Sequence, residues 1–290
     1  MPPQQTDVTC QTGRDDFIAY HLPALKQDEV RHNLILAILE QFARGSAPNL
    51  RYWTLGAAGA CAVQTKGWSI VLGELDHDQC HELAEATVAL DYLGVVGPDQ
   101  TAQWFARHAA ARGLRFAEPI PQRIHALHER PVYPGTSGHA RIADAASTDL
   151  YADWTIAFLR EAVPHDPVPS REWIKQAATE GNALFWIVDG EPVATATIAR
   201  RTSHTATISR VYTPPRLRGR GYAGSVTAAL VDRILAEGRT AACLYTDLRN
   251  PISNRCYANI GFKPVCASWH VPRASPDAPD TVHATTFRPR

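Results

Sequence analysis

The spacing of apolar residues in the second half of the chain alternates between the short period of strands and the longer period of helices. Residues 183–188 (ALFWIV) form an apolar run, and the Asp189-Gly190 pair that follows is a hairpin-turn signal. Regular alternation over 205–213 would place Ile208, Arg210 and Tyr212 on one face of a strand. The pattern predicts strands at 139–146, 183–188, 192–199, 205–213, 241–245 and 262–271, and helices at 148–163, 170–180, 223–237 and 251–259.

The first half shows a similar order of elements less clearly. The expected helices cover 15–25, 28–44, 77–90 and 99–112, and the expected strands cover 50–55, 60–66, 68–72 and 122–127. Residues 92–96 form an apolar segment. In both halves two helices precede an antiparallel meander, and a strand-turn-helix unit follows. This order indicates a degenerate structural repeat.

Residues 130–138 (RPVYPGTSG) separate the two halves. They are rich in Pro, Gly and Ser and have no apolar periodicity, which is typical of a linker. A length of 290 residues also suits two domains of about 150 residues each. We therefore expect one domain over residues 1–134 and a second over 135–290.

The net charge of zero conceals an asymmetry between these halves. Residues 1–134 have 11 Lys and Arg against 15 Asp and Glu, whereas residues 135–290 have 18 against 14. The second half thus suits a polyphosphate ligand but lacks the strongly basic face of a duplex nucleic-acid binder. The sequence has no membrane-length apolar stretch and no signal-peptide pattern, so we expect a cytoplasmic protein without membrane association. Its six scattered cysteines form no Cys-x-x-Cys pair, so we expect neither disulfides nor a metal site.

The strongest chemical signal is a glycine loop between the strand at 205–213 and the next helix. Gly219 and Gly221 allow backbone N–H groups to converge, and the helix N-terminus adds partial positive charge. Together they predict an anion-binding site, which three arginines surround: Arg216, Arg218 and Arg220. Pro214 and Pro215 cannot donate ladder hydrogen bonds, so they end the strand before this loop.

Residues 216–221 (RLRGRG) resemble the acyl-CoA signature of the GNAT superfamily, Arg/Gln-x-x-Gly-x-Gly/Ala. The resemblance implies an α/β protein of the α+β type, in which each of two GNAT-like domains is a mixed, mostly antiparallel sheet flanked by helices. It implies that the preceding strand pairs its backbone with the pantetheine arm and that the loop holds the pyrophosphate. The cofactor-binding residues would be Val211, Tyr212, Thr213, Arg216, Arg218, Gly219, Arg220, Gly221, Tyr222 and Ala223.

Residues 250–262 (NPISNRCYANIGF) look like the second signature of this family, Asn-x-x-(Ser/Ala)-x-x-x-Tyr-x-x-x-Gly-Phe. Ser253 and Tyr257 are four residues apart and so share a helix face. The resemblance implies that Tyr257 is the general acid that protonates the departing CoA thiolate, and that Asn250 and Ser253 contact the cofactor. Asn250 also suits a helix N-cap before Pro251, and Tyr257 could alternatively be a packing aromatic beside Phe262.

Two parts of the chemistry stay open in the sequence. No motif position identifies the base that deprotonates an amine acceptor, and the alternatives are Asp247, Glu161, Asp189 and His270. His77 and His81 have the i, i+4 spacing of a metal site, but without a third ligand at fixed spacing we interpret them as the polar start of a helix. In the first half, residues 94–98 lack arginine and Pro98 removes an amide, so we expect no CoA site there.

The leading hypothesis is therefore a GNAT-family N-acyltransferase (EC 2.3.1 class). It would move an acetyl or other acyl group from acyl-CoA to a primary amine of a small molecule by direct attack, without a metal. One alternative is a transferase of the same fold with aminoacyl-tRNA as donor, the only case in which tRNA would be a partner. Another is a non-catalytic acyl-CoA sensor. Fold does not fix the acceptor.

Overall fold

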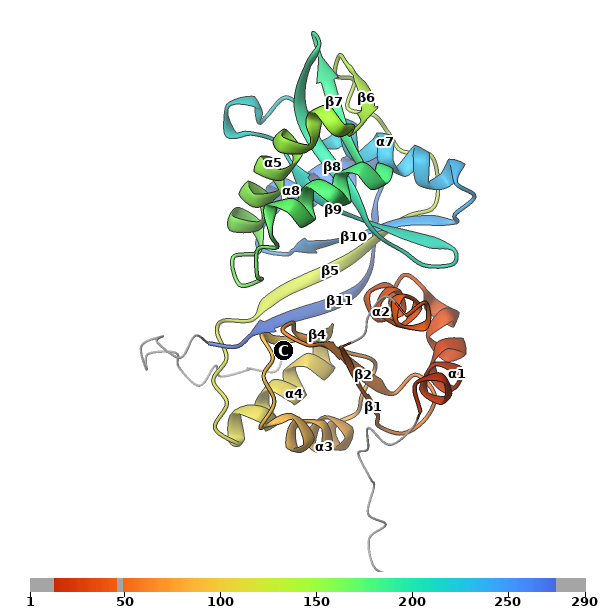
Figure 1. The fold of residues 1–290 in the computed structure, drawn as a ribbon, viewed down its shortest axis with the longest axis vertical. Helices are drawn as coiled ribbons and strands as arrows, with labels where there is room; N and C mark the ends of the chain where they lie inside the picture. The colour runs from red at the N-terminus through yellow and green to blue at the C-terminus, as the bar shows by residue number, and fades with distance from the viewer. Residues whose placement is uncertain (1–12, 46–48, 275–290) are drawn as a thin grey trace, which may run out of the picture. The chain divides into compact units, whose positions relative to one another are not determined.

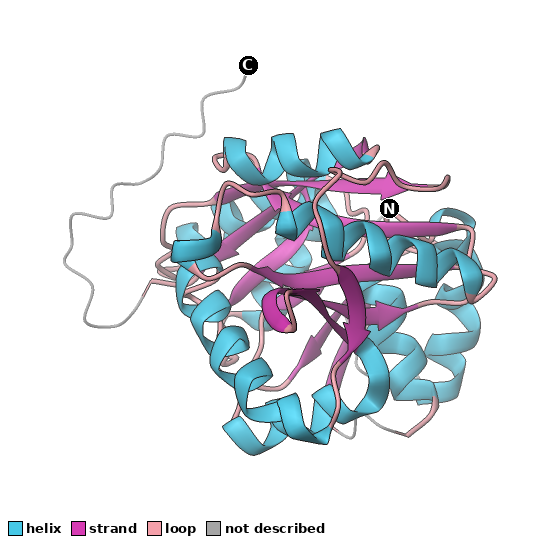
Figure 2. Ribbon diagram, turned by 90° about the horizontal axis from the view of Figure 1, so that it is seen from above, coloured by secondary structure: helices cyan, strands magenta, loops and turns pink. Residues whose placement is uncertain are grey.

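The computed structural model describes residues 13–45 and 49–274, and the chain folds into two compact units. Unit 1 contains the residues up to Arg123 and those from Cys266 onward, and unit 2 contains Ile124–Val265. In both units strands alternate with helices, which Figure 2 distinguishes by colour. No helix among the described residues is long and apolar enough to cross a membrane.

Unit 1 begins with two helices, followed by an antiparallel meander of three strands. β1 pairs with β2 and β2 with β3, whereas β3 pairs in parallel with β4, and β4 pairs in antiparallel fashion with β11. Helices α3 and α4 lie side by side (Figure 1). The elements are α1 (Arg14–Leu25), η1 (Lys26–Asp28), α2 (Asn33–Ala43), β1 (Leu50–Thr54), β2 (Cys61–Thr65), β3 (Ile70–Leu72), α3 (His77–Thr87), β4 (Gly94–Pro98), α4 (Asp99–Ala111), β5 (Ile120–Leu127) and β11 (Lys263–Pro272).

The strands of unit 1 bury both faces because successive side chains alternate between them. Cys61 and Val63 of β2 pack in one cluster with Leu36 of α2, whereas Ala62 packs in another with Leu83 of α3. The helices therefore cover the strands from two sides.

Unit 2 repeats this order of helices and strands after an additional first strand, β6. Its strands follow the order β10-β9-β8-β7-β6, in which β9 and β10 are parallel and the other pairs are antiparallel. The elements are β6 (His139–Ile142), η2 (Ala145–Ser147), α5 (Thr148–Ala162), α6 (Arg171–Ala177), η3 (Ala178–Asn182), β7 (Ala183–Val188), β8 (Glu191–Arg201), β9 (Thr205–Tyr212), η4 (Pro215–Leu217), α7 (Tyr222–Ala236), β10 (Ala241–Asp247) and α8 (Pro251–Ile260).

Alternation along the strands again assigns one face to each helix layer. Leu184 of β7 belongs to the cluster that contains Leu230 of α7, whereas its neighbour Phe185 packs with Tyr151 of α5 and Ile174 of α6. The sheet of unit 2 thus has an α7 face and an α5/α6 face. The fold class expected from the sequence is confirmed, because each unit carries the same αα-βββ-α-β-α order on a mostly antiparallel sheet.

The last strand of each repeat extends beyond the unit in which the repeat began. β5 starts in unit 1, but from Ile124 it belongs to unit 2, where it neighbours β10. β11 starts in unit 2, and from Ser268 it pairs with β4 of unit 1. The boundary expected at Pro134 differs from this division, since it follows the sequence order and does not allow for strands that change unit.

Two element predictions differ from the structure in detail. The strand expected at 139–146 ends at Ile142, because Asp144 and Ser147 form a reciprocal capping box that starts a helical turn. The helix expected at 170–180 is regular only to Ala177, and Gly181 then adopts a φ of 73°.

Candidate active site

β9 is followed by a loop that leads the chain into α7. One turn of 3-10 helix (η4) precedes Arg218, which is extended. Gly219 and Gly221 have φ angles of 78° and 81°, in the left-handed region that favours glycine. Residues with a Cβ adopt this conformation at a cost of about 1–2 kcal/mol each, so the two glycines determine the path of the loop.

The loop presents a run of backbone donors. Among the described residues, no acceptor pairs with the N–H groups from Gly219 to Gly224, which precede the first intrahelical bond of Ser225 to Gly221. The start of α7 also carries the partial positive charge of a helix N-terminus. This arrangement is suited to an anionic group such as a pyrophosphate.

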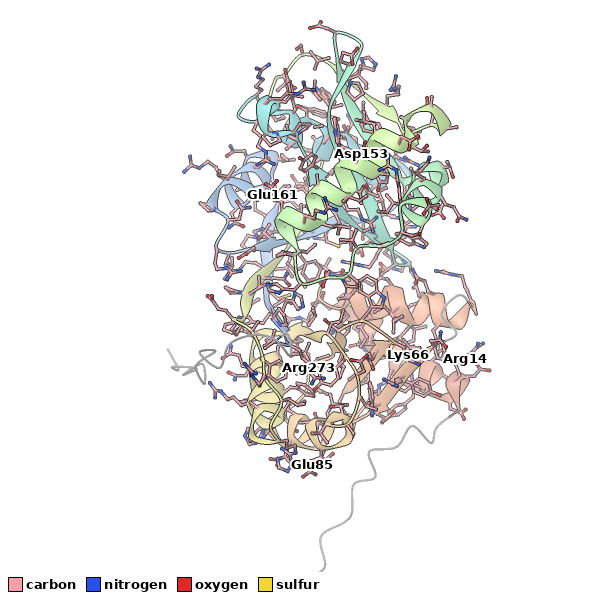
Figure 3. The ribbon with its side chains drawn as sticks, turned by 60° about the vertical axis from the view of Figure 1, so that its left-hand side comes forward. Arg14, Lys66, Glu85, Asp153, Glu161 and Arg273 are labelled. Atoms are coloured by element: carbon pink, nitrogen blue, oxygen red, sulfur yellow. The ribbon has the colours of Figure 1, made fainter. Side chains whose placement is uncertain are left out.

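Of the three arginines in the loop, Arg218 is held in place. Its Nε donates to the Thr213 carbonyl at 2.9 Å, and its guanidinium forms an ion pair of 2.7 Å with Glu161, which lies near the end of α5 (Figure 3). The hydrogen bond that Arg218 donates to Glu161 is the main cause that raises the pKa of Arg218. Arg216 and Arg220 are exposed and form no ion pair with any residue that the structure describes. They are the loop's available cations.

Residues 132–137, which we call the crossing segment, pack over the start of α7. The sequence suggests a linker here, but these residues form specific contacts within unit 2. A Cβ added to Gly221 would lie 2.8 Å from Cγ2 of Thr136 and 3.2 Å from Cβ of Pro134. The hydrogen bonds are Val132 N–H to the Ile260 carbonyl (2.8 Å), Tyr133 hydroxyl to Asp232 (2.7 Å), Thr136 hydroxyl with that of Ser225 (2.7 Å) and Trp186 Nε1 to the Ser137 carbonyl (2.9 Å).

Next to this loop, β9 and β10 separate. They pair only from Ala241 opposite Thr205 to Cys243 opposite Thr207, although β9 continues to Tyr212 and β10 to Asp247. Beyond Thr207, the β9 and β10 edges that face each other therefore have backbone groups available to a ligand that enters between them.

Arg210 forms a bulge at the point where the strands separate. Its φ is 52°, and the register of β9 with β8 shifts between Ser209 and Tyr212, the stretch that contains it. Ile208 belongs to the α7-face cluster, whereas the ring of Tyr212 lies 6.2 Å from that of Trp154 on α5. The prediction that Ile208, Arg210 and Tyr212 share one face is therefore wrong, because the bulge reverses the alternation.

Tyr257 lies on α8, which follows β10. Its ring is 6.1 Å from that of Phe262, so the packing contact is present. Its hydroxyl has no hydrogen-bond partner among the described residues, and burial raises the pKa of this phenol above its ordinary value, which keeps it protonated. The start of α7 is close to this helix, since a Cβ added to Gly224 would lie 3.7 Å from Sγ of Cys256.

The other predicted residues lie around these features. Asn250 is the N-cap of α8 and accepts the Ser253 N–H at 3.1 Å, which confirms its capping role. Tyr212 and Thr213 are buried, and the Oγ1 of Thr213 is buried without a partner among the described residues. Val211 packs against the α7-face cluster. The glycine loop, the separated strands and Tyr257 thus come from consecutive elements of unit 2.

Comparisons with known proteins identify this part of the chain. Residues 146–262 match the model of the Acetyltransferase (GNAT) family. Residues 146–262 belong to the GNAT acetyltransferase family. A comparison with curated proteins finds no match.

Among solved structures, the fold of the whole chain is similar to that of several proteins. An X-ray structure of a Drosophila protein has a TM-score of 0.68 at 13% identity and covers 91% of this chain and 97% of its own. A GCN5-related N-acetyltransferase from Kribbella flavida has a TM-score of 0.55 at 18% identity, covering 83% and 96%. A GNAT-family acetyltransferase from Colwellia psychrerythraea has a TM-score of 0.53 at 12% identity, covering 87% and 97%. These similarities concern the fold.

The four candidate bases outside the motifs have other roles or positions. Asp247 accepts the Arg249 N–H at 2.8 Å and pairs with its guanidinium, which is loop capping. Glu161 pairs with Arg218, and Asp189 lies in the turn between β7 and β8. His270 lies on the part of β11 that belongs to unit 1, outside the unit that contains the GNAT domain's loop.

The histidines at the start of α3 belong to a cluster that spacing did not predict. The ring of His108 on α4 lies 4.5 Å from that of His77 and 5.0 Å from that of His81. Within residues 13–45 and 49–274, no group of three His, Cys, Asp or Glu could hold a metal ion. Asp76 caps the helix through a capping box with Gln79, as expected for a polar helix start.

Proposed function

We propose that the chain is an acyltransferase that moves an acetyl or other acyl group from acyl-CoA to a primary amine of a small molecule. The observation that carries this proposal is the adjacency of the unpaired N–H groups of Gly219–Gly224 to the separation of β9 and β10. The first feature suits the anionic end of the donor, and the second suits an extended arm that needs backbone partners.

The residues present fit acyl-CoA. The N–H groups of the glycine loop would hold the pyrophosphate, and the exposed Arg216 and Arg220 would add charge-assisted contacts. Backbone groups of Val211 to Thr213, past the bulge, would pair with the pantetheine arm. When bound, acyl-CoA supplies an activated thioester carbonyl and a thiolate leaving group.

The proposed transfer forms a bond between the amine nitrogen and the acyl carbon and breaks the bond between that carbon and sulfur. Backbone N–H groups near Val211 to Thr213 would stabilise negative charge on the carbonyl oxygen. Tyr257 would give its proton to the leaving sulfur, because its raised pKa keeps it protonated at neutral pH, and would then regain a proton from water. The amine's extra proton would pass to water, since Asp247 and Glu161 are both in ion pairs.

Calorimetric binding of acetyl-CoA tests the glycine loop. Gly221→Trp should abolish binding, because the indole would displace Thr136 and cover the N–H groups. Gly238→Trp is the matched control. It has a similar φ of 80° at the other end of α7, with nothing within 4 Å of an added Cβ, and should bind as the wild type does.

Thiol release with a panel of primary amines then tests catalysis. Equal acetyl-CoA binding by wild type and Gly221→Trp would mean that the site lies elsewhere. Salt-sensitive tRNA binding without acyl-CoA affinity would favour aminoacyl-tRNA as the donor. Acyl-CoA binding without thiol release for any amine would favour a sensor.

A further inference from the structure

Arg200 of β8 carries a charge for which the described residues provide no acidic partner. It lies on β8 opposite Thr207 of β9, just past an irregular step in the register. Its guanidinium lies 5.7 Å from the centre of the Tyr245 ring. Thr207 in turn contacts Cys243 of β10 at 3.3 Å. Since Ala242 and Leu244 belong to the α7-face cluster, Cys243 and Tyr245 lie on the α5/α6 face, and Arg200 lies there with them.

No acid in the described part of the chain neutralises Arg200. Its Nε is buried without a hydrogen-bond partner, and its guanidinium forms no ion pair with any of these residues. Its neighbour Arg201 is different, because it forms an ion pair of 3.0 Å with Glu237 and also donates to Asn182. The Arg200 side chain is half-buried. A charge that is partly removed from water without a counterion is costly, and a cation–π contact offsets only part of that cost.

A second arginine lies on the same face. Arg210, at the bulge of β9, places its guanidinium 5.9 Å from the centre of the Trp173 ring on α6 and also has no ion pair among the residues described. The burial of Arg200 lowers the pKa of its guanidinium, and the like charge of Arg210 acts in the same direction. Two cations without an acid form a site with affinity for an anion.

This site adjoins the separation of the strands. Thr207 opposite Cys243 is the last paired position of β9 and β10, and Arg200 lies beside Thr207 on the next strand. A ligand held by Arg200 is therefore next to the closed end of the separation, on the face opposite α7. The thioester of a donor that enters from the glycine loop would approach from the open end.

We infer that the amine acceptor carries a carboxylate, which Arg200 binds with the help of Arg210, so that the acceptor is of the amino-acid class. This inference rests on the proposed acyl transfer. A guanidinium matches a carboxylate through two parallel hydrogen bonds, and the partly dry site strengthens them. Arg200 is then a specificity-determining residue of the acceptor site.

Paired acceptors test the inference in the full-length protein. Each pair consists of an amino acid and its decarboxylated amine: glycine with methylamine, alanine with ethylamine, phenylalanine with phenethylamine. For at least one pair, wild type should give a kcat/KM about 10-fold to 100-fold higher for the amino acid, as expected for hydrogen bonds to a charged group. Arg200→Met should lose this preference through KM of the amino acid, while KM of acetyl-CoA stays unchanged. Arg201→Met is the matched control and should keep the preference.

The outcomes that overturn the inference differ from those that overturn acyl transfer. Absence of a wild-type preference for the amino acid in every pair, or a preference that survives in Arg200→Met, would refute carboxylate binding while thiol release still supports acyl transfer. Absence of acetyl-CoA binding or of any thiol release would instead refute the proposed function on which the inference depends. If Arg200→Met does not fold, the wild-type ratios together with those of Arg210→Met decide.

Discussion

The glycine loop offers a pair of substitutions that separate backbone strain from packing. Gly219 and Gly221 have nearly the same φ, 78° and 81°, and both are exposed. An added Cβ at Gly219 would meet nothing within 4 Å, whereas at Gly221 it would lie 2.8 Å from Thr136 and 3.2 Å from Pro134. Gly219→Ala and Gly221→Ala therefore share the cost of the left-handed conformation, and only Gly221→Ala adds the cost of contact with the crossing segment.

The shared cost is the left-handed conformation, about 1–2 kcal/mol for alanine. The loss of glycine's freedom in the unfolded chain offsets about 0.4–1 kcal/mol of this cost. Gly219→Ala should thus lower the free energy of unfolding by about 1 kcal/mol. At Gly221 the crossing segment must also move, and forced contacts of this kind cost about 1–3 kcal/mol. Gly221→Ala should therefore cost about 2–4 kcal/mol.

Urea denaturation followed by tryptophan fluorescence measures both values, and Trp186 reports on the region because it donates to Ser137 of the crossing segment. Thr136→Ser in the Gly221→Ala background should recover part of the loss, since it removes Cγ2 and keeps the hydroxyl that bonds Ser225. Equal losses for the two alanine variants, or no recovery, would refute the idea that the crossing segment packs on Gly221.

Three further predictions concern α8. Tyr257→Phe should lower kcat about 10²-fold to 10⁴-fold without changing acetyl-CoA affinity in calorimetry, and an unchanged kcat would remove Tyr257 from the mechanism. Burial raises the pKa of Tyr257, so the folded state keeps a proton that the unfolded state loses near pH 10. The contribution of Tyr257 to the free energy of unfolding should therefore be complete below about pH 10 and fall above it. In urea titrations at several pH values, Tyr257→Phe should lack this pH-dependent contribution. Asn250→Ala should cost about 1 kcal/mol of unfolding free energy through its lost cap, whereas Asn259→Ala at the exposed far end of α8 should not; equal effects would contradict the capping role.

The elements were predictable where the chain carries its own local signals. The Asp189-Gly190 turn, the apolar run before it and the glycines around α7 each act over a few residues, and the structure places β7, β8 and α7 there. The bulge at Arg210 had no such signal, because an arginine with positive φ results from the pairing of β8 with β9 and not from its own preference.

The candidate site likewise has parts that the sequence predicts and parts that it does not. The glycine loop and Asn250 were predictable, because the spacing of residues in their motifs determines their local structure. Thr136 and Arg200 do not, because Thr136 is 89 residues from its partner Ser225, and Arg200 owes its significance to the lack of an acid around it among the described residues. Only tertiary packing defines such relations. Composition gave one hint, the excess of arginine and lysine in the second half.

β5, the last strand of the first repeat, extends into unit 2, which contains the candidate site. Past Cys243, β10 no longer pairs with β9, so its remaining neighbour in unit 2 is β5, whose residues 124–127 belong to that unit. The hydroxyl of Thr246 lies 3.3 Å from Nε2 of His125, which ties the two strands at this level. A fragment that starts at residue 135 would leave this end of β10 without a strand on either side. The first repeat thus supplies the strand that flanks β10 where β10 separates from β9.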